Sequence, residues 1–182
     1  MGEFLSQVAD YHDLLVYQKS ECIYDITYFF VNHFLQKGDR TVDQMLQAAR
    51  SGKQNIAEGK AASVTSRETE IKLTNVAKAS LKELKEDYVD YLRVRGLEQW
   101  TAGSEKFEQA RKVCASHNDS AYYREAVAQR SAATVANIAI ILCNQEDYML
   151  FKLIESLKKR FLEHGGIKEE MTRARIEKRR GY

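Results

Sequence analysis

The sequence predicts an all-α protein that folds as a helical bundle, and three features point to this class. The chain of 182 residues contains no proline, the residue that most strongly interrupts a helix. Hydrophobic residues make up 44% and charged residues 30%, and the helix-favouring residues Ala, Glu, Lys, Leu and Gln are plentiful. Short runs of alternating apolar and polar residues, which are typical of strands, are missing. The length is that of a single domain.

The first two helices are predicted at residues 14–36 and 42–58. In the first, apolar side chains recur every three or four positions, which places them on one face of a helix. Residues 37–40, Lys-Gly-Asp-Arg, predict a turn, and Thr41 suits the N-cap of the second helix. Gly59 suits the left-handed residue that ends a helix, so a positive φ angle is expected there.

The third helix is predicted from Ser66, a good N-cap residue, to Gly96. Residues 98–120 then form an insert before the last long helix. Within the insert, residues 104–114 suit a short helix.

The last long helix is predicted at residues 121–163. Gly165 and Gly166 end it, and residues 167–180 form a further helix. The stretch 131–145 carries no charge and is apolar on all sides, so we expect it to be covered all round. It is shorter than the roughly 20 apolar residues that a membrane span requires.

Two arrangements would cover residues 131–145: a second layer formed by the insert, or a neighbouring subunit. We favour the subunit, so the sequence predicts a homo-oligomer. The interface residues expected on this basis are Ala132, Ala136, Ala139, Ile140 and Cys143.

Two short motifs are the most informative part of the chain. They are QAARSGKQNIAEG at residues 47–59 and VAKASLKEL at residues 76–84. Both resemble the pattern of a four-helix bundle family first described as proteins encoded in intervening sequences of bacterial 23S ribosomal RNA genes. The motif residues to which the resemblance gives structural roles are Ser51, Asn55, Glu58, Gly59, Ser80 and Glu83. Glu58 and Glu83 are expected to be polar anchors inside or between the helices.

The chain departs from the family pattern at three positions. Gln47 stands where an Arg is common, Gly52 where an Ile is usual, and Ala79 where a Gly is usual. Gln47 weakens the transfer of a phosphate-contacting role to its position.

The resemblance extends to the end of the chain, because residues 136–175 are similar to a longer subgroup with an extra segment after a Gly-Gly break. It implies an antiparallel up-and-down four-helix bundle at residues 1–164, with the helical insert at about 98–120, and a basic helical extension at residues 165–182. It also implies a ring of five identical subunits. More distantly, the chain is similar to the accessory proteins of diversity-generating retroelements, which bind nucleic acid and a reverse transcriptase.

Positive charge is concentrated near the C-terminal end of the sequence. Residues 158–180 contain nine Lys and Arg against four Glu, whereas the whole chain carries a net charge of +2. This pattern suits contact with phosphates, and equally a solvated helix with Glu–Arg pairs or the surface for an acidic protein partner. Since aromatic residues are scarce there, any binding of RNA or DNA is expected to be independent of sequence. The candidate phosphate contacts are Arg50, Lys53, Lys168, Arg173, Arg175, Lys178, Arg179 and Arg180.

No pattern in the sequence predicts catalysis, a metal site, a cofactor or a small-molecule substrate. The Glu-x-x-His pairs of di-iron bundles are missing, and Cys114 with His117 supplies only two of four zinc ligands. Three widely spaced cysteines (Cys22, Cys114 and Cys143) indicate buried thiols in a reducing compartment. The first residues lack the basic start and apolar core of a secretory signal. A cytoplasmic location without a membrane partner is therefore expected.

The sequence thus predicts a non-catalytic, oligomeric helical bundle that acts as an assembly or adaptor protein and binds RNA or DNA through basic residues. Two alternatives remain open at this point. One is a purely structural scaffold between proteins, and the other is a small metal-binding or enzymatic bundle.

Overall fold

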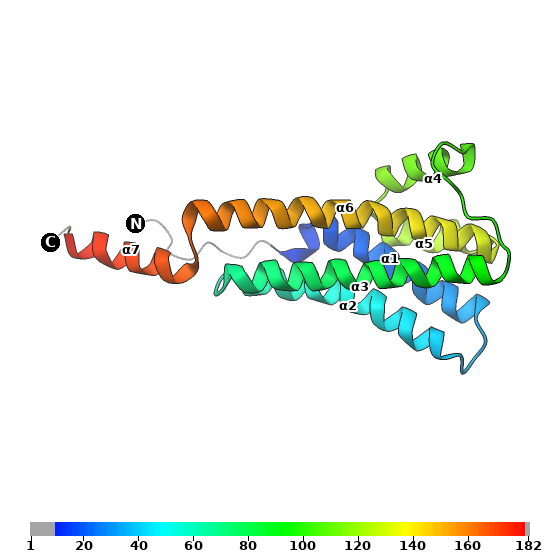
Figure 1. Cartoon of the computed structure of the whole chain (residues 1–182), viewed down its shortest axis with the longest axis horizontal. Coiled ribbons are helices and arrows are strands. Elements are labelled where there is room, and N and C mark those ends of the chain that lie inside the picture. Colours follow the sequence, from blue (N-terminus) through cyan, green and yellow to red (C-terminus); the bar gives the residue numbers. More distant parts are fainter. Residues whose placement is uncertain (1–9, 181–182) are drawn as a thin grey trace.

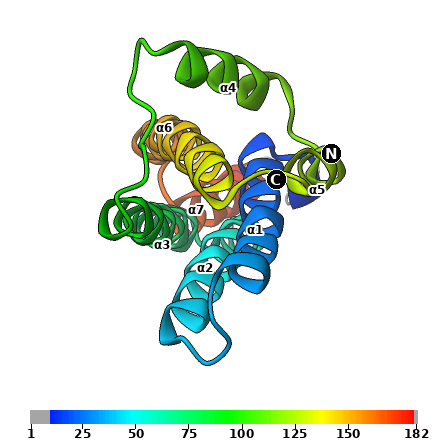
Figure 2. The ribbon, with the colours of Figure 1, turned by 90° about the vertical axis from the view of Figure 1, so that its right-hand side faces the viewer.

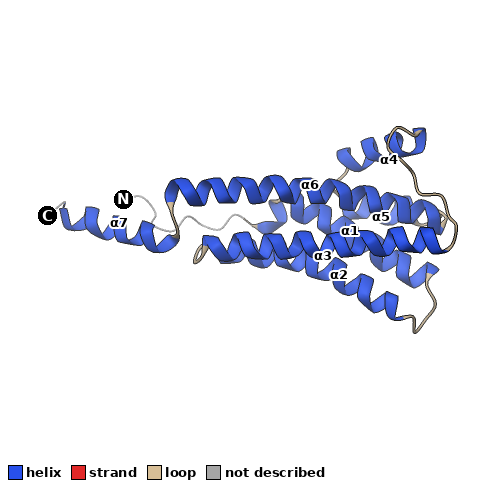
Figure 3. Ribbon diagram, in the orientation of Figure 1, coloured by secondary structure: helices blue, strands red, loops and turns tan. Residues whose placement is uncertain are grey.

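The computed structural model describes residues 10–180, and every regular element in that range is a helix (Figure 3). The elements are a short 3-10 helix η1 (Tyr11–Asp13), α1 (Leu15–Phe34), α2 (Arg40–Ala62), α3 (Arg67–Val94), α4 (Glu105–Ser116), α5 (Ser120–Val127), α6 (Ala132–His164) and α7 (Ile167–Arg180). The predicted all-α class is confirmed. Residues 1–9 and 181–182, at the outer ends of the two predicted regions, lie outside the described part of the chain.

Four long helices share one hydrophobic core (Figures 1 and 2). The pairs in contact are α1 with α2, α2 with α3, α3 with α6, and α6 with α1. Each helix turns an apolar face inward; Phe30, Leu84, Tyr88 and Leu142, for example, have no exposed surface. The Tyr88 hydroxyl donates a hydrogen bond to Thr27 Oγ1 at 3.0 Å, which satisfies this buried polar group.

Helices α2 and α3 approach each other closely where α2 carries glycine. A Cβ atom at Gly52 would lie 2.6 Å from Leu81 Cδ2, and one at Gly59 would lie 3.3 Å from the carbonyl oxygen of Glu70. The expected positive φ at Gly59 is wrong, because α2 continues to Ala62. Gly59 is required by the close approach of α3 and not by a helix end.

The start of α2 also differs from the prediction by two residues. Asp39, not Thr41, is the N-cap: its Oδ1 accepts a hydrogen bond from the Thr41 backbone N–H at 2.8 Å. Asp is as good a capping residue as Thr, and it precedes Thr41 in the turn. The predicted N-cap Ser66 is confirmed, with its Oγ accepting from Thr69 N–H at 3.1 Å.

The predicted long helix at residues 121–163 is wrong, because it is broken at residues 128–131. The break separates α5, which packs on α1, from α6. Ser131 starts α6 by accepting a hydrogen bond from the Thr134 N–H at 3.3 Å. Residues 128–131 include no glycine or proline that would interrupt a helix. The packing of α5 on α1 determines where the helix is interrupted.

Helix α4 lies on the outer side of α6 (Figure 2) and supplies the second layer that residues 131–145 require. Ala136 and Ala139 are fully buried within the chain, Ile140 is 5% exposed and Cys143 is 2% exposed. Ala132 is half-buried. The assignment to a subunit interface is therefore wrong for Ala136, Ala139, Ile140 and Cys143, which other helices of the same chain already cover. For the half-buried Ala132 it stays a prediction.

Helix α7 continues beyond the end of α6 and away from the packed helices (Figure 1). None of its residues is buried. Within residues 10–180, no helix is both long enough and apolar enough to cross a membrane.

Candidate nucleic-acid interface

The direction of α7 is set by the two glycines that precede it. Gly165 adopts a φ of 72° and donates its N–H to the Phe161 carbonyl oxygen at 2.8 Å, which closes the end of α6. The Gly166 N–H donates to Glu169 Oε2 at 2.6 Å. This contact caps the first turn of α7, where a carboxylate is also favoured by the helix dipole.

Arg67, at the start of α3, holds α7 in place. Its Nη1 donates to the Gly165 carbonyl oxygen at 2.6 Å, and its Nη2 pairs with Glu170 Oε2 at 2.7 Å. The Arg67 side chain is only 14% exposed. One guanidinium therefore binds both the hinge and the first turn of α7.

A second ion pair joins the end of α6 to α3. Arg160 Nη2 donates to Glu70 Oε2 at 2.6 Å, and the Glu70 side chain is 7% exposed. Burial raises the pKa of Glu70, and the positive charge of Arg160 acts against that rise. The end of the packed helices from which α7 projects is thus held by Arg–Glu contacts.

The basic segment divides into a paired part on α6 and an unpaired part on α7. Lys158, Lys159 and Arg160 each have an acidic partner, at 3.2, 3.8 and 2.6 Å. On α7, Arg173 donates to the His164 carbonyl oxygen. Arg173 therefore also has no acidic partner among the described residues. The other cations of α7 have neither an acidic partner nor a side-chain hydrogen bond within residues 10–180, and they are Lys168, Arg175, Lys178, Arg179 and Arg180.

These five cations are all exposed. Of the nearby carboxylates, Glu169 is used by the Gly166 N–H and Glu170 by Arg67. The 14 residues of α7 span about 21 Å at 1.5 Å per residue. The five cations, called the α7 strip here, are spread along a helix as long as about twelve phosphates of a duplex. Glu177 is exposed among them and has no ion pair within residues 10–180, so the strip has a positive excess but is not free of negative charge.

Arg50 and Lys53, the other two predicted contacts, lie apart from this strip, on the side of α2 that faces α1. They line a groove of about 460 Å³ to which α7 contributes no residue. Lys53 Nζ lies 4.6 Å from the centre of the Tyr24 ring, within reach of a cation–π contact. Tyr11 and Tyr17 line the same groove.

These tyrosines were not predicted from the sequence as partners of the basic residues. The available signal was the spacing of Tyr17 and Tyr24, which are seven residues apart and hence share a helix face. The pairing with α2 was not visible in the sequence, since it depends on the packing of two helices.

Three of the motif residues meet where α2 contacts α3. Ser51 Oγ and Ser80 Oγ are 2.9 Å apart, and Asn55 Nδ2 donates to the Ser51 carbonyl oxygen at 2.8 Å. Glu58 and Glu83 are both exposed, and Glu58 accepts a hydrogen bond from Gln54. The expectation that these two carboxylates are anchored among the helices of the chain is wrong. They point outward because their positions fall on the solvent side of α2 and α3.

Two ionisable residues that were not predicted from the sequence are buried in the core. Lys19 is 2% exposed and donates to the carbonyl oxygens of Cys114 and, at 3.1 Å, His117. Glu146 is fully buried, and neither of its oxygens has a hydrogen-bond partner among the described residues. Burial raises the pKa of Glu146 well above its ordinary value, and lowers the pKa of Lys19. The burial of Glu146 could have been predicted, because it lies four residues from both Leu142 and Leu150 and therefore shares their buried helix face.

The cysteines are free and buried, as predicted. Burial raises the pKa of Cys22 and of Cys143 to about 12, so both thiols are protonated and weakly nucleophilic at neutral pH. In the part of the chain that the structure describes, no group of three or more His, Cys, Asp or Glu side chains is arranged to hold a metal ion.

Comparison of the chain with protein-family models, with curated proteins and with solved structures found no match.

Proposed function

We propose that the chain is a non-catalytic adaptor that binds RNA or DNA through the phosphate backbone, using the cations of α7. The observation that supports this is the strip of five exposed Lys and Arg side chains without acidic partners. On an exposed helix without a binding function, Lys and Arg are usually interspersed with Asp and Glu, as they are at the end of α6. On α7, two of the three carboxylates, Glu169 and Glu170, instead contact Gly166 and Arg67 and fix the helix itself, which leaves Glu177 beside the five cations.

The proposed binding does not depend on base sequence. Lys and Arg contacts with phosphate are electrostatic and read no base edge. The tyrosine groove beside Arg50 and Lys53 is the reserve surface, because tyrosine rings stack on the bases of single strands.

We also propose that α1, α2, α3 and α6 form an antiparallel up-and-down four-helix bundle of the family of 23S rRNA intervening-sequence proteins, and that five copies form a ring in the cytoplasm. The cyclic order of helix contacts and the Ser51–Ser80 contact at the two motifs support the bundle. Since residues 131–145 are covered, a subunit contact would use the exposed apolar side chains of α6, namely Tyr148, Phe151 and Leu162. In a ring, several copies of α7 would act together.

The direct test is to remove α7. Fluorescence anisotropy with labelled 20-nucleotide RNA and DNA would compare the full chain with one that ends at Gly166. We expect the shorter chain to lose most of the affinity while it keeps its helical content and its mass in light scattering. Equal affinity of the two chains would reject α7 as the contact.

An acidic protein partner is the second candidate, because the same strip would attract it. A full chain that is correctly folded and assembled but binds neither RNA nor DNA at low salt would favour this scaffold function.

A further inference from the structure

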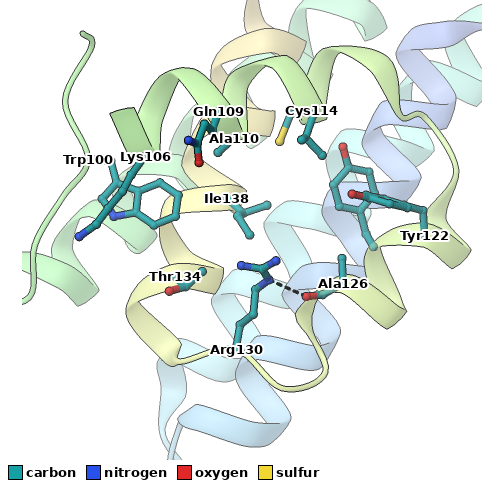
Figure 4. A pocket seen from close by; sticks show the side chains of 12 residues that line it. Trp100, Lys106, Gln109, Ala110, Cys114, Tyr122, Ala126, Arg130, Thr134 and Ile138 are labelled. Carbon is teal, nitrogen blue, oxygen red and sulfur yellow. Dashed lines mark hydrogen bonds between the residues drawn. The ribbon is translucent and has the colours of Figure 1, made fainter. Parts of the chain in front are cut away.

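A cavity of about 370 Å³ lies under the insert, between α4, α5 and α6 (Figure 4). It is separate from α7 and from the tyrosine groove, since it shares no residue with either. Its size is at the lower end of the range for sites that bind small molecules. Ile138 of α6 lies at its centre, and Trp100 and Tyr122 stand at opposite ends.

Both aromatic ends are held in position by neighbouring residues. The Trp100 backbone N–H donates to Asn137 Oδ1 at 2.7 Å, and Asn137 is 2% exposed. Asn137 Nδ2 in turn donates to the Glu98 carbonyl oxygen at 2.9 Å, which fixes the loop before α4. Tyr122 stacks on His117, with ring centres 3.9 Å apart. The cavity is therefore formed before any ligand arrives, which lowers the entropic cost of binding.

One unneutralised charge faces this apolar space. Arg130 is exposed at the edge of the cavity and donates its Nε–H to the Ala126 carbonyl oxygen at 2.8 Å. Its Nη1 and Nη2 have no acidic partner within residues 10–180. Figure 4 shows the guanidinium turned toward Ile138. The other cation at the cavity, Lys106, pairs with Glu98 at 2.7 Å. No Asp or Glu is among the described residues that line the cavity.

We propose that this cavity binds a small molecule with an apolar, preferably aromatic, body and one carboxylate. The planar guanidinium of Arg130 presents two N–H groups that match the two oxygens of a carboxylate. Trp100 and Tyr122 supply faces and edges for the ring of the ligand, and Ile138 supplies an apolar floor. This binding site is independent of the proposed contact with nucleic acid.

The chain carries its own reporter for this site, because Trp100 is its single tryptophan. The full chain would be titrated with benzoate and with benzamide, its neutral isostere, and the Trp100 fluorescence followed. We expect a saturable change with benzoate, with a dissociation constant in the millimolar range, and binding of benzamide that is weaker by about tenfold.

Two variants and a control locate the binding. Arg130→Gln should weaken benzoate binding by about tenfold and leave benzamide unchanged, because the loss concerns the charged contact alone. Ala126→Phe should fill the cavity and abolish binding of both. The control is Lys112→Gln, which removes one exposed charge from α4 outside the cavity. Circular dichroism verifies the fold of each variant.

Three results would overturn the proposal. They are a fluorescence that does not respond to benzoate, equal affinities for benzoate and benzamide, and an Arg130→Gln variant that binds benzoate like the unaltered chain.

Discussion

The carboxyl group of Glu146 accepts no hydrogen bond from the described residues, although it is fully buried. Its pKa in the folded chain is raised above its ordinary value of 4.5, so below that pH the group is protonated whether the chain is folded or not. As the pH rises past 4.5, the unfolded chain ionises while the folded chain keeps the proton. Stability is therefore lost with rising pH, up to the pKa of the folded state.

Glu146→Gln should remove this loss, because Gln has nearly the same shape and no proton to release. We expect the variant to melt at a higher temperature than the unaltered chain at about pH 8, and at nearly the same temperature at about pH 4. Thermal unfolding followed by circular dichroism measures both. A variant that is less stable at about pH 8 would mean that Glu146 is ionised and stabilised by Lys19.

Gly52 and Gly59 differ in how much space their neighbours leave. A Cβ at Gly52 would lie 2.6 Å from the buried Leu81 side chain, whereas at Gly59 the nearest atom is 3.3 Å away. Gly52→Ala should destabilise the chain by roughly 1–3 kcal/mol, since overpacking outweighs the gain of up to about 1 kcal/mol in helix propensity. Gly59→Ala should cost less.

Urea unfolding measures both changes, and Gln47→Ala, at an exposed position of the same helix, is the control. If Gly52→Ala proved as stable as the unaltered chain, the close packing of α2 on α3 would be wrong.

At the scale of the elements, Arg67 decides how firmly α7 is attached. It binds the Gly165 carbonyl oxygen and the Glu170 carboxylate, and α7 buries no residue of its own. Arg67→Ala should speed amide hydrogen exchange in α7 by at least tenfold, while exchange in α1, α2 and α3 stays unchanged.

The matched control is Arg93→Ala, because within residues 10–180 the acidic partner of Arg93 is Asp90 on its own helix. Hydrogen exchange measured by mass spectrometry resolves α7 from the rest. Unchanged exchange in α7 after Arg67→Ala would show that other contacts hold it.

The sequence predicted most elements well where local signals decide them. Ser66 caps α3, and Ser104, at the first residue of the predicted 104–114 helix, caps α4 through its contact with Phe107 N–H. Gly165 ends α6 as expected. These features depend on a few neighbouring residues, so spacing and residue type suffice.

Predictions failed where a distant element decides the conformation. The residues around Gly59 in the sequence predict a helix end. Only the position of α3 shows that Gly59 lies inside α2 and allows the two helices to approach closely. The break at residues 128–131 depends on the packing of α5 on α1. Likewise, the sequence predicted only a basic segment at residues 158–180. The division into paired cations on α6 and unpaired cations on α7 required the ion pairs themselves.

For the whole molecule, the covered face of α6 changes the expected effect of one substitution. At a subunit interface, Ile140→Glu would separate the subunits and leave each one folded, but Ile140 is 5% exposed within the chain. An unpaired buried charge costs several kcal/mol, so we expect Ile140→Glu to unfold the chain.

Phe151→Glu, at a side chain that is 47% exposed, should leave the fold intact and reduce the mass of the assembly. Size-exclusion chromatography with light scattering, combined with circular dichroism, separates the two effects. A chain that is monomeric at micromolar concentration before any substitution would contradict the proposed ring.

The central functional claim is that phosphates bind the five free cations of α7. Its most direct test is the dependence of nucleic-acid affinity on salt, compared between the unaltered chain and two variants. The first variant replaces Lys168, Arg175, Lys178, Arg179 and Arg180 with Gln. The control variant removes five exposed cations elsewhere by replacing Lys72, Lys82, Arg93, Lys112 and Lys152 with Gln.

Each contact with a duplex phosphate contributes about 0.9 to the slope of log affinity against log salt concentration. Loss of the five α7 cations should therefore flatten the slope by up to about 4.5 per subunit engaged, whereas the control variant should keep nearly the full slope. Equal flattening by both variants would mean that net charge, and not α7, attracts the nucleic acid, and this result would contradict the account.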